Sequence, residues 1–99
     1  MKGPLIYYEI KDTYGTDLSS TKLASELRQS VLDDLDLGFN VELDFKGVRS
    51  ISRGWGRNLI GLIAKEKGYS FVKDHILLSN MSKSVRTTLL EGTEDAVAQ

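Results

Sequence analysis

The sequence contains no cysteine, one proline, one tryptophan and one histidine among its 99 residues. The lack of cysteine excludes disulfides, thiolate nucleophiles and thiolate metal ligands, and it fits a reducing compartment. The lone histidine, His75, has no cysteine or second histidine with which to share a metal ion. We therefore expect neither a metal site nor another cofactor.

An excess of charge of one sign is also missing. Thirteen Lys and Arg residues against fourteen Asp and Glu residues give a net charge of -1. This balance offers no overall attraction to nucleic acid or to an anionic membrane. The N-terminal apolar run ends before Glu9, which is too short for a signal-peptide core or a membrane span. We expect a cytoplasmic protein that binds neither nucleic acid nor membrane.

Length and composition indicate one small globular domain. A chain of 99 residues with 40% hydrophobic and 27% charged residues can bury a single core. We expect residues 1–99 to form that one domain, with an ordered core over about residues 4–92. The segment after Gly92 is expected to fray.

The first half of the chain changes its apolar period twice. Residues 5–10 are rich in aromatic and β-branched side chains, which predicts a strand followed by a polar loop. Between residues 20 and 36 apolar residues recur every four positions, which predicts an amphipathic helix capped by Ser19 or Ser20. Residues 40–45 alternate strictly and predict a strand with one polar face, formed by Asn40, Glu42 and Asp44.

The second half predicts two further helices around a strand. Residues 53–67 have a helical period, and Gly68 closes the segment. Trp55 falls on the apolar stripe of this helix and is expected in the core, while Arg53 and Arg57 lie together on an outward side. A loop, a strand over residues 75–79 and a helix capped by Asn80 or Ser82 complete the chain, and this helix is expected to end at Gly92.

The predicted order of elements is β-α-β-α-β-α with short connections. This order indicates an α/β fold with a largely parallel sheet joined by right-handed crossovers. Because a sheet covered on both faces would have continuous apolar strands, the polar face of residues 40–45 predicts helices mainly on one face.

The stretch LDFKGVRSIS, followed by a helix, resembles the STAS domain of anti-sigma factor antagonists and sulfate transporter tails. The chain is most similar to the bacterial STAS-like group of unknown function, and the similarity spans most of residues 5–92. The positions that match these patterns are Asp44, Gly47, Val48, Ile51, Ser52, Trp55, Asn80 and Val85.

The resemblance implies a STAS-like fold and a regulatory module that binds a protein partner, with an ATP-binding kinase of the anti-sigma type as the first candidate. In anti-sigma factor antagonists a serine at the helix start accepts phosphate from that kinase. Gly54 stands at this position here, and Ser52 replaces the family's aspartate two positions earlier. Ser52 is therefore a candidate phosphoacceptor, although a serine before a helix is usually a cap.

One local basic cluster surrounds the start of the second helix and consists of Lys46, Arg49, Arg53 and Arg57. It is either a solvated face or an anion-binding site, because the free amides of a helix start attract anions. Gly54 and Gly61 lie on a third side of the same helix. They are either tolerated glycines or a low strip that a partner backbone could approach.

These patterns leave two functions open. The first is a non-catalytic regulatory module that docks a protein partner through Lys46, Arg49, Ser52, Arg53, Gly54 and Arg57. The second is a sensor of a nucleotide or small anion that uses the same basic cluster. An enzyme is not expected, because the pattern assembles no set of acid, base and nucleophile. A homodimer is left open.

Overall fold

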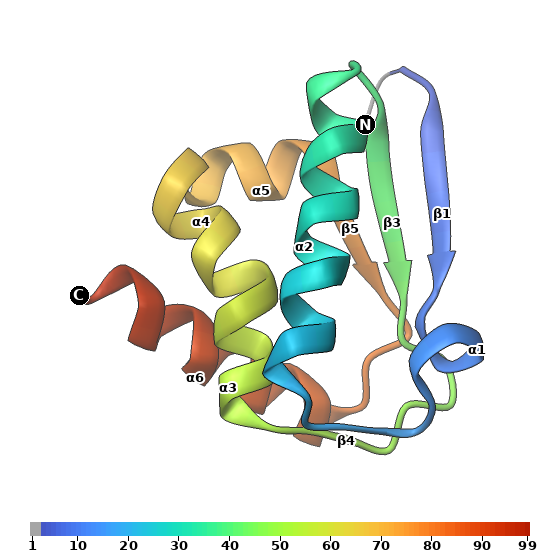
Figure 1. Ribbon diagram of the computed structural model, residues 1–99, viewed down its shortest axis with the longest axis vertical. Coiled ribbons are helices and arrows are strands. Elements are labelled where there is room, and N and C mark those ends of the chain that lie inside the picture. Colours follow the sequence, from blue (N-terminus) through green and yellow to red (C-terminus); the bar gives the residue numbers. More distant parts are fainter. Residues whose placement is uncertain (1–2) are drawn as a thin grey trace.

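The main sheet of the computed structural model, which describes residues 3–99, has three parallel strands. Its strands are β1 (Leu5–Glu9), β3 (Asn40–Asp44) and β5 (Ile76–Ser79), in the order β1-β3-β5 (Figure 1). The register pairs Tyr8 with Leu43 and Leu43 with Leu78, so one face is continuously apolar. The predicted parallel sheet is confirmed.

The longer helices lie on one side of this sheet (Figure 1). They are α2 (Thr21–Asp36), a continuous helical segment made of α3 (Arg53–Gly56), the π-helical η1 (Arg57–Gly61) and α4 (Leu62–Lys67), and α6 (Lys83–Val97). On the opposite face Leu5, Tyr7 and Leu77 are exposed. The expected one-sided covering of the sheet is confirmed.

The strict β-α alternation is wrong, because the chain contains additional short elements. The segment after β1 forms α1 (Ile10–Tyr14) and β2 (Asp17–Leu18), and β2 pairs in parallel with β4 (Ser50–Ile51). Ile10 and Leu18 are buried and hold the segment on the core. The expected polar loop before α2 is therefore packed structure.

The loop expected between the second helix and β5 is also wrong. Gly68, at φ +94°, turns the chain into α5 (Tyr69–His75). No residue of α5 is buried. Because α5 spans seven residues and only partly buries Val72, the sequence lacked the repeated apolar stripe by which a helix is recognised.

The expected helix end at Gly92 is wrong as well. The helix α6 continues to Val97, and Ala96 beyond the glycine is fully buried. Gly92 is helical and does not have the positive φ of a C-terminal glycine cap. Its role is close packing: a Cβ there would overlap the Arg53 carbonyl oxygen and would lie 2.6 Å from the Arg57 nitrogen.

Trp55 anchors the core, as predicted. Its side chain is 1% exposed, and its ring meets that of Phe45 edge-on with 6.1 Å between centroids. Tryptophan and phenylalanine contribute more buried apolar area than other side chains. This contact fixes the start of α3 against the end of β3.

Candidate partner-docking surface at the carboxyl edge of the sheet

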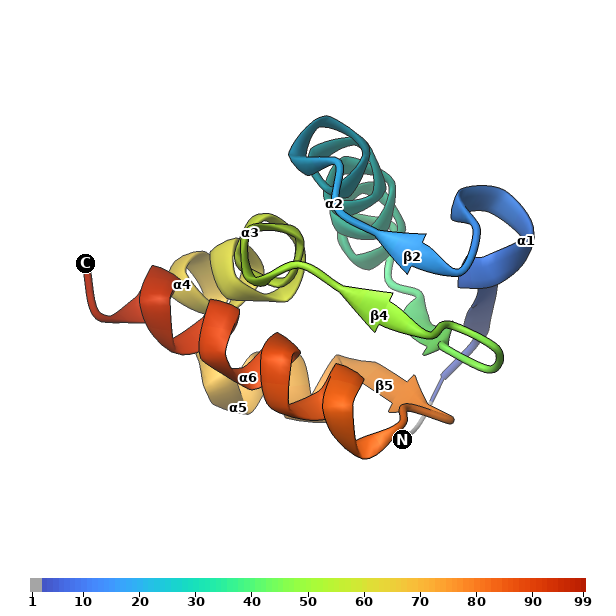
Figure 2. The ribbon, with the colours of Figure 1, turned by 90° about the horizontal axis from the view of Figure 1, so that it is seen from below.

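The starts of three helices gather at one edge of the sheet. The strands are parallel, so the turns that follow β3 and β5 emerge at the same end. Figure 2 shows β2 and β4 side by side at this end, leading into α2 and α3. In open α/β sheets the carboxyl edge is where ligands and partners bind.

Asp44 connects the ends of the three strands at this edge. Its carboxylate accepts hydrogen bonds from the Tyr7 hydroxyl, from Asn80 Nδ2 at 2.9 Å and from the Lys46 backbone nitrogen at 2.9 Å. Asn80 adopts a left-handed conformation at φ +56° as β5 ends. Asp44 is only 6% exposed, so the expectation that it lies on a wet face is wrong.

Asn40 departs from the same expectation, whereas Glu42 does not. Asn40 is buried, with its side-chain oxygen 2.9 Å from His75 Nδ1. Glu42 is half-buried, accepts a hydrogen bond from the Ser79 hydroxyl at 2.7 Å and lies in register with the exposed residues Tyr7 and Leu77. The polar residues of β3 are therefore bonded to side chains of β1, of α5 and of β5 or the turn after it, which satisfies them where water is scarce.

The bond between Tyr7 and Asp44 changes the ionisation of both groups. The hydrogen bond from Tyr7 lowers the pKa of Asp44, and the bonds from Asn80 and Lys46 lower it further. The hydrogen bond to Asp44 raises the pKa of Tyr7 to about 12. A hydrogen bond to the charged carboxylate favours that form, and the same bond keeps the phenol protonated.

Replacement of Tyr7 by phenylalanine should lower stability only in a pH window. Asp44 stabilises the fold above its unfolded pKa of about 4, and this contribution is lost as the pH falls through the lower folded value. Tyr7 contributes below its unfolded pKa of about 10, and this contribution is lost as the pH rises toward 12. Urea unfolding of both proteins across this range should show a plateau in the difference between pH 4 and 10. A pH-independent difference would contradict the bond.

The loop between β3 and α3 is fixed by the segment before α2. Arg49 donates two hydrogen bonds to Asp17, with its Nη2 atom 2.5 Å from the carboxylate, and the Ser50 hydroxyl donates to the same group at 2.7 Å. The bonds from Arg49 and Ser50 hold the pKa of Asp17 well below its usual range. The backbone adds support, because the Ser52 amide donates to the Leu18 carbonyl oxygen at 2.7 Å.

Arg53 is exposed and Arg57 is half-buried, so neither faces the core, as the sequence predicted, but both side chains are bonded within the chain. Arg53 donates to Asp95 through two nitrogens at 2.5 and 2.8 Å, and Arg57 donates to the Gln99 side chain at 2.7 Å. Both acceptors belong to the last part of α6 and its end. This pairing depends on α6 continuing past Gly92, which the sequence did not predict.

Gly61 does not form an open strip for a partner either. A Cβ at Gly61 would lie 2.9 Å from the Ala96 Cβ and 3.0 Å from the Gly92 carbonyl oxygen, so α6 of the same chain occupies this side. Gly54 is different, because a Cβ there would meet only the Thr21 methyl group at 3.3 Å. Gly54 thus stays at the edge beside the start of α2.

Ser52 caps α3, since its hydroxyl oxygen accepts a hydrogen bond from the Trp55 amide at 3.0 Å. Ser52→Ala removes this acceptor and should lower the free energy of unfolding by about 1 kcal/mol. Ser70→Ala is the matched control, because Ser70 is exposed on α5 and caps no helix. Urea denaturation measures both, and equal stabilities for the two variants would contradict the capping role.

The structure therefore brings together only part of the predicted site. We define the edge surface as Asp17, Lys46, Arg49, Ser50, Ser52 and Gly54. Beside it lies a depression of about 100 Å³ that Tyr14, Leu23 and Trp55 help to line. Sequence reasoning missed Asp17 because it lies 32 positions before its partner Arg49, and no local pattern joins them.

Comparison with known proteins identifies the family. The family model of the STAS-like domain of unknown function (DUF4325) matches residues 24–86. The chain belongs to this STAS-like family. No curated protein and no solved structure matches the chain.

The matched segment of this STAS-like domain contains the loop after β3 and the start of α3, on which the resemblance rested. The resemblance to the STAS-like group is thus confirmed. Asp17 and Asp95, the partners of Arg49 and Arg53, lie outside the matched segment.

Two further properties were searched in the described part of the chain. Among residues 3–99, no helix is long and apolar enough to cross a membrane. Over the same residues, no group of three His, Asp or Glu side chains could hold a metal ion.

Proposed function

We propose that this STAS-like domain is a non-catalytic regulatory module of the cytoplasm that docks a protein partner through the edge surface. An ATP-binding kinase of the anti-sigma type is the first candidate partner. The observation that carries the proposal is the Asp17–Arg49 pair: both side chains are largely exposed, yet hydrogen bonds hold them in place. A surface of fixed, opposite charges loses little conformational freedom when it binds a partner.

The bonds that the arginines already form favour docking of a protein partner over binding of a small anion. Arg49 and Arg53 each form an ion pair with an aspartate, and Arg57 is bonded to Gln99. A phosphate group would have to displace these partners. At the start of α3 the Ser52 hydroxyl already occupies the Trp55 amide, which an anion would otherwise use. A protein partner can instead bind the pairs as they stand, with both signs of charge.

Ser52 remains the candidate phosphoacceptor within this surface. Its side chain is half-buried and its oxygen serves as the cap of α3. A phosphoryl group on this oxygen would add negative charge at a helix start, where it is electrostatically favoured. Phosphorylation would then add negative charge to the edge surface at the start of α3.

Site-specific photo-crosslinking tests the docking role. A photoreactive phenylalanine analogue at Lys46 places the probe on an exposed turn of the edge surface, and the same analogue at Glu66 places it on exposed α4. We expect the Lys46 probe to capture one protein with an ATP-binding kinase domain in cells of the native host, and the Glu66 probe to capture none. Capture of the same proteins by both probes would contradict a specific docking surface.

A further inference from the structure

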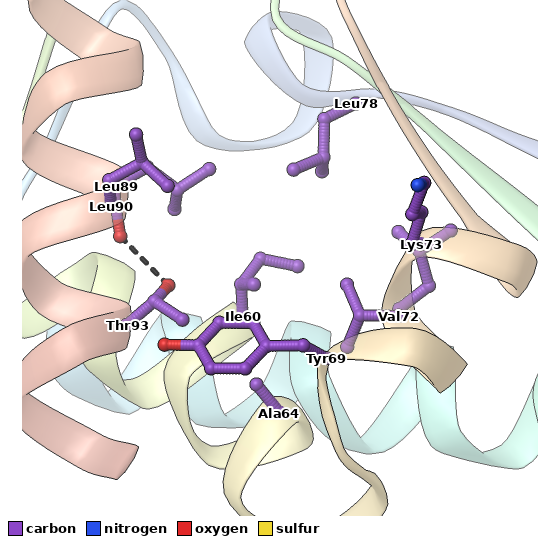
Figure 3. Close-up of a pocket in the computed structure, with 10 residues that line it drawn as sticks. Ile60, Ala64, Tyr69, Val72, Lys73, Leu78, Leu89, Leu90 and Thr93 are labelled. Carbon is purple, nitrogen blue, oxygen red and sulfur yellow. Dashed lines mark hydrogen bonds between the residues drawn. The ribbon is translucent and has the colours of Figure 1, made fainter. Parts of the chain in front are cut away.

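A second hollow is formed by residues from the second half of the chain. It has a volume of about 370 Å³ and lies between η1, α4, α5, β5 and α6 (Figure 3). This volume falls in the range of sites that hold small molecules. The residues that form it are distinct from those of the edge surface.

The hollow exists because α5 packs on α4 and β5 and leaves a gap toward α6. Small side chains, Ala64 and Thr93, lie on two sides of the gap and do not fill it. Its walls are mainly apolar, formed by Ile60, Val72, Leu78, Leu89 and Leu90 among others. A pocket with such walls is a poor site for water and a good one for hydrocarbon.

The polar groups of the pocket differ in what they bind. The Thr93 hydroxyl is already used, because it donates to the Leu89 carbonyl oxygen at 2.8 Å. Within residues 3–99, Lys73 has no ion pair and the Tyr69 hydroxyl has no hydrogen bond. Figure 3 shows the Tyr69 ring crossing the pocket toward Thr93, with the Lys73 ammonium far from the Tyr69 hydroxyl. One uncompensated cation therefore stands beside an apolar pocket.

We infer that this pocket binds a small amphipathic carboxylate, whose apolar body enters between α5 and α6 and whose carboxylate pairs with Lys73. An apolar body matches the walls, and a single negative charge matches the single free cation. A doubly charged anion or a sugar would leave polar groups unpaired against Ile60 and Leu89. This inference does not depend on the proposed docking role.

Octanoate and its uncharged match 1-octanol serve as probes, with binding followed through the backbone amide resonances of the isotopically labelled domain. Octanoate should shift the resonances of Val72, Lys73 and Leu90. Lys73→Gln should raise the dissociation constant for octanoate by about 5- to 10-fold, which corresponds to roughly 1 to 1.4 kcal/mol, and should leave that for octanol within about twofold because the apolar contacts remain. Lys65→Gln, on exposed α4, is the control and should change neither.

Leu90→Trp provides a second test. Leu90 is 53% exposed at the rim, so a larger side chain can be accommodated there and can close the pocket. This variant should lose binding of both probes while its remaining spectrum stays folded. Three results would overturn the inference: no shifts at the pocket, octanoate binding that is indifferent to Lys73→Gln, or a wild-type dimer that Leu90→Trp disrupts. The last would assign the pocket to a second copy of the chain.

Discussion

Gly92→Ala should destabilise the domain by about 3 kcal/mol, the upper end of the usual cost of overpacking a core. An added Cβ would overlap the Arg53 carbonyl oxygen and would lie 2.6 Å from the Arg57 nitrogen. Both are backbone atoms, so no side chain can rotate to make room. Alanine in a helix interior normally gains about 1 kcal/mol over glycine, so the expected change has the opposite sign to the helix propensity. Urea denaturation measures it.

Gly54→Ala is the matched control for this substitution. Gly54 is also helical, but its added Cβ would meet only the Thr21 methyl group, at 3.3 Å. We expect its stability to change by less than about 1 kcal/mol. Stabilisation by Gly92→Ala, or equal effects at both positions, would show that α6 does not pack on α3 as closely as the structure indicates.

Trp55→Ala should lower the free energy of unfolding by about 3 to 5 kcal/mol, the usual cost of truncating a buried tryptophan. Trp55 is buried against Phe45 and stands at the start of α3. Small domains have total stabilities of about 5 to 15 kcal/mol, so a substantial part of the stability would be lost. Thermal and urea denaturation both report this change.

Fluorescence gives an independent check on the same residue. Trp55 is the only tryptophan, so all tryptophan emission comes from this site. We expect emission that is blue-shifted in the folded protein and moves to longer wavelength on unfolding. Emission like that of free tryptophan in the folded state would contradict a core position and would favour a binding role.

The elements that could be predicted are those with a clear apolar period. The α2 helix has a buried stripe of Ala24, Leu27 and Val31, and its bounds agree with the prediction to within one residue. The alternation of β3 was likewise sufficient to find the strand. In both cases one face of the element contacts the core. The apolar residues on that face therefore recur with the period of a helix or a strand, and this period can be recognised in the sequence.

The elements that could not be predicted lack that signal. The α5 helix has only seven residues and no fully buried one, so its sequence carries no repeated apolar stripe. Glycine commonly ends a helix, so Gly92 was interpreted as a helix end. The structure explains the glycine by the close approach of the α3 backbone to α6. A single sequence does not distinguish a glycine that ends a helix from a glycine that allows two helices to pack closely.

The position of the candidate site was predicted, but the hydrogen-bond partners of its arginines were not. The sequence located Lys46, Arg49, Ser52 and Gly54 at one helix start, and the structure keeps these residues at one edge. The sequence could not show that Arg49, Arg53 and Arg57 are bonded to Asp17, Asp95 and Gln99, because the two members of each pair are more than 30 residues apart. Charge compensation over such distances depends on the tertiary fold.

The central claim is that the edge surface docks a protein partner, and a charge exchange tests it most directly. The double variant Asp17→Arg with Arg49→Asp keeps an ion pair between the two positions but reverses its direction on the surface. Lys65→Glu changes the charge of exposed α4 and serves as the control. Titration calorimetry with the crosslinked partner measures the dissociation constant of each variant. We predict that the exchange weakens binding by at least about 100-fold, or roughly 3 kcal/mol, while the control binds like the wild type. Wild-type affinity in the exchanged variant, with its fold intact, would contradict the claim.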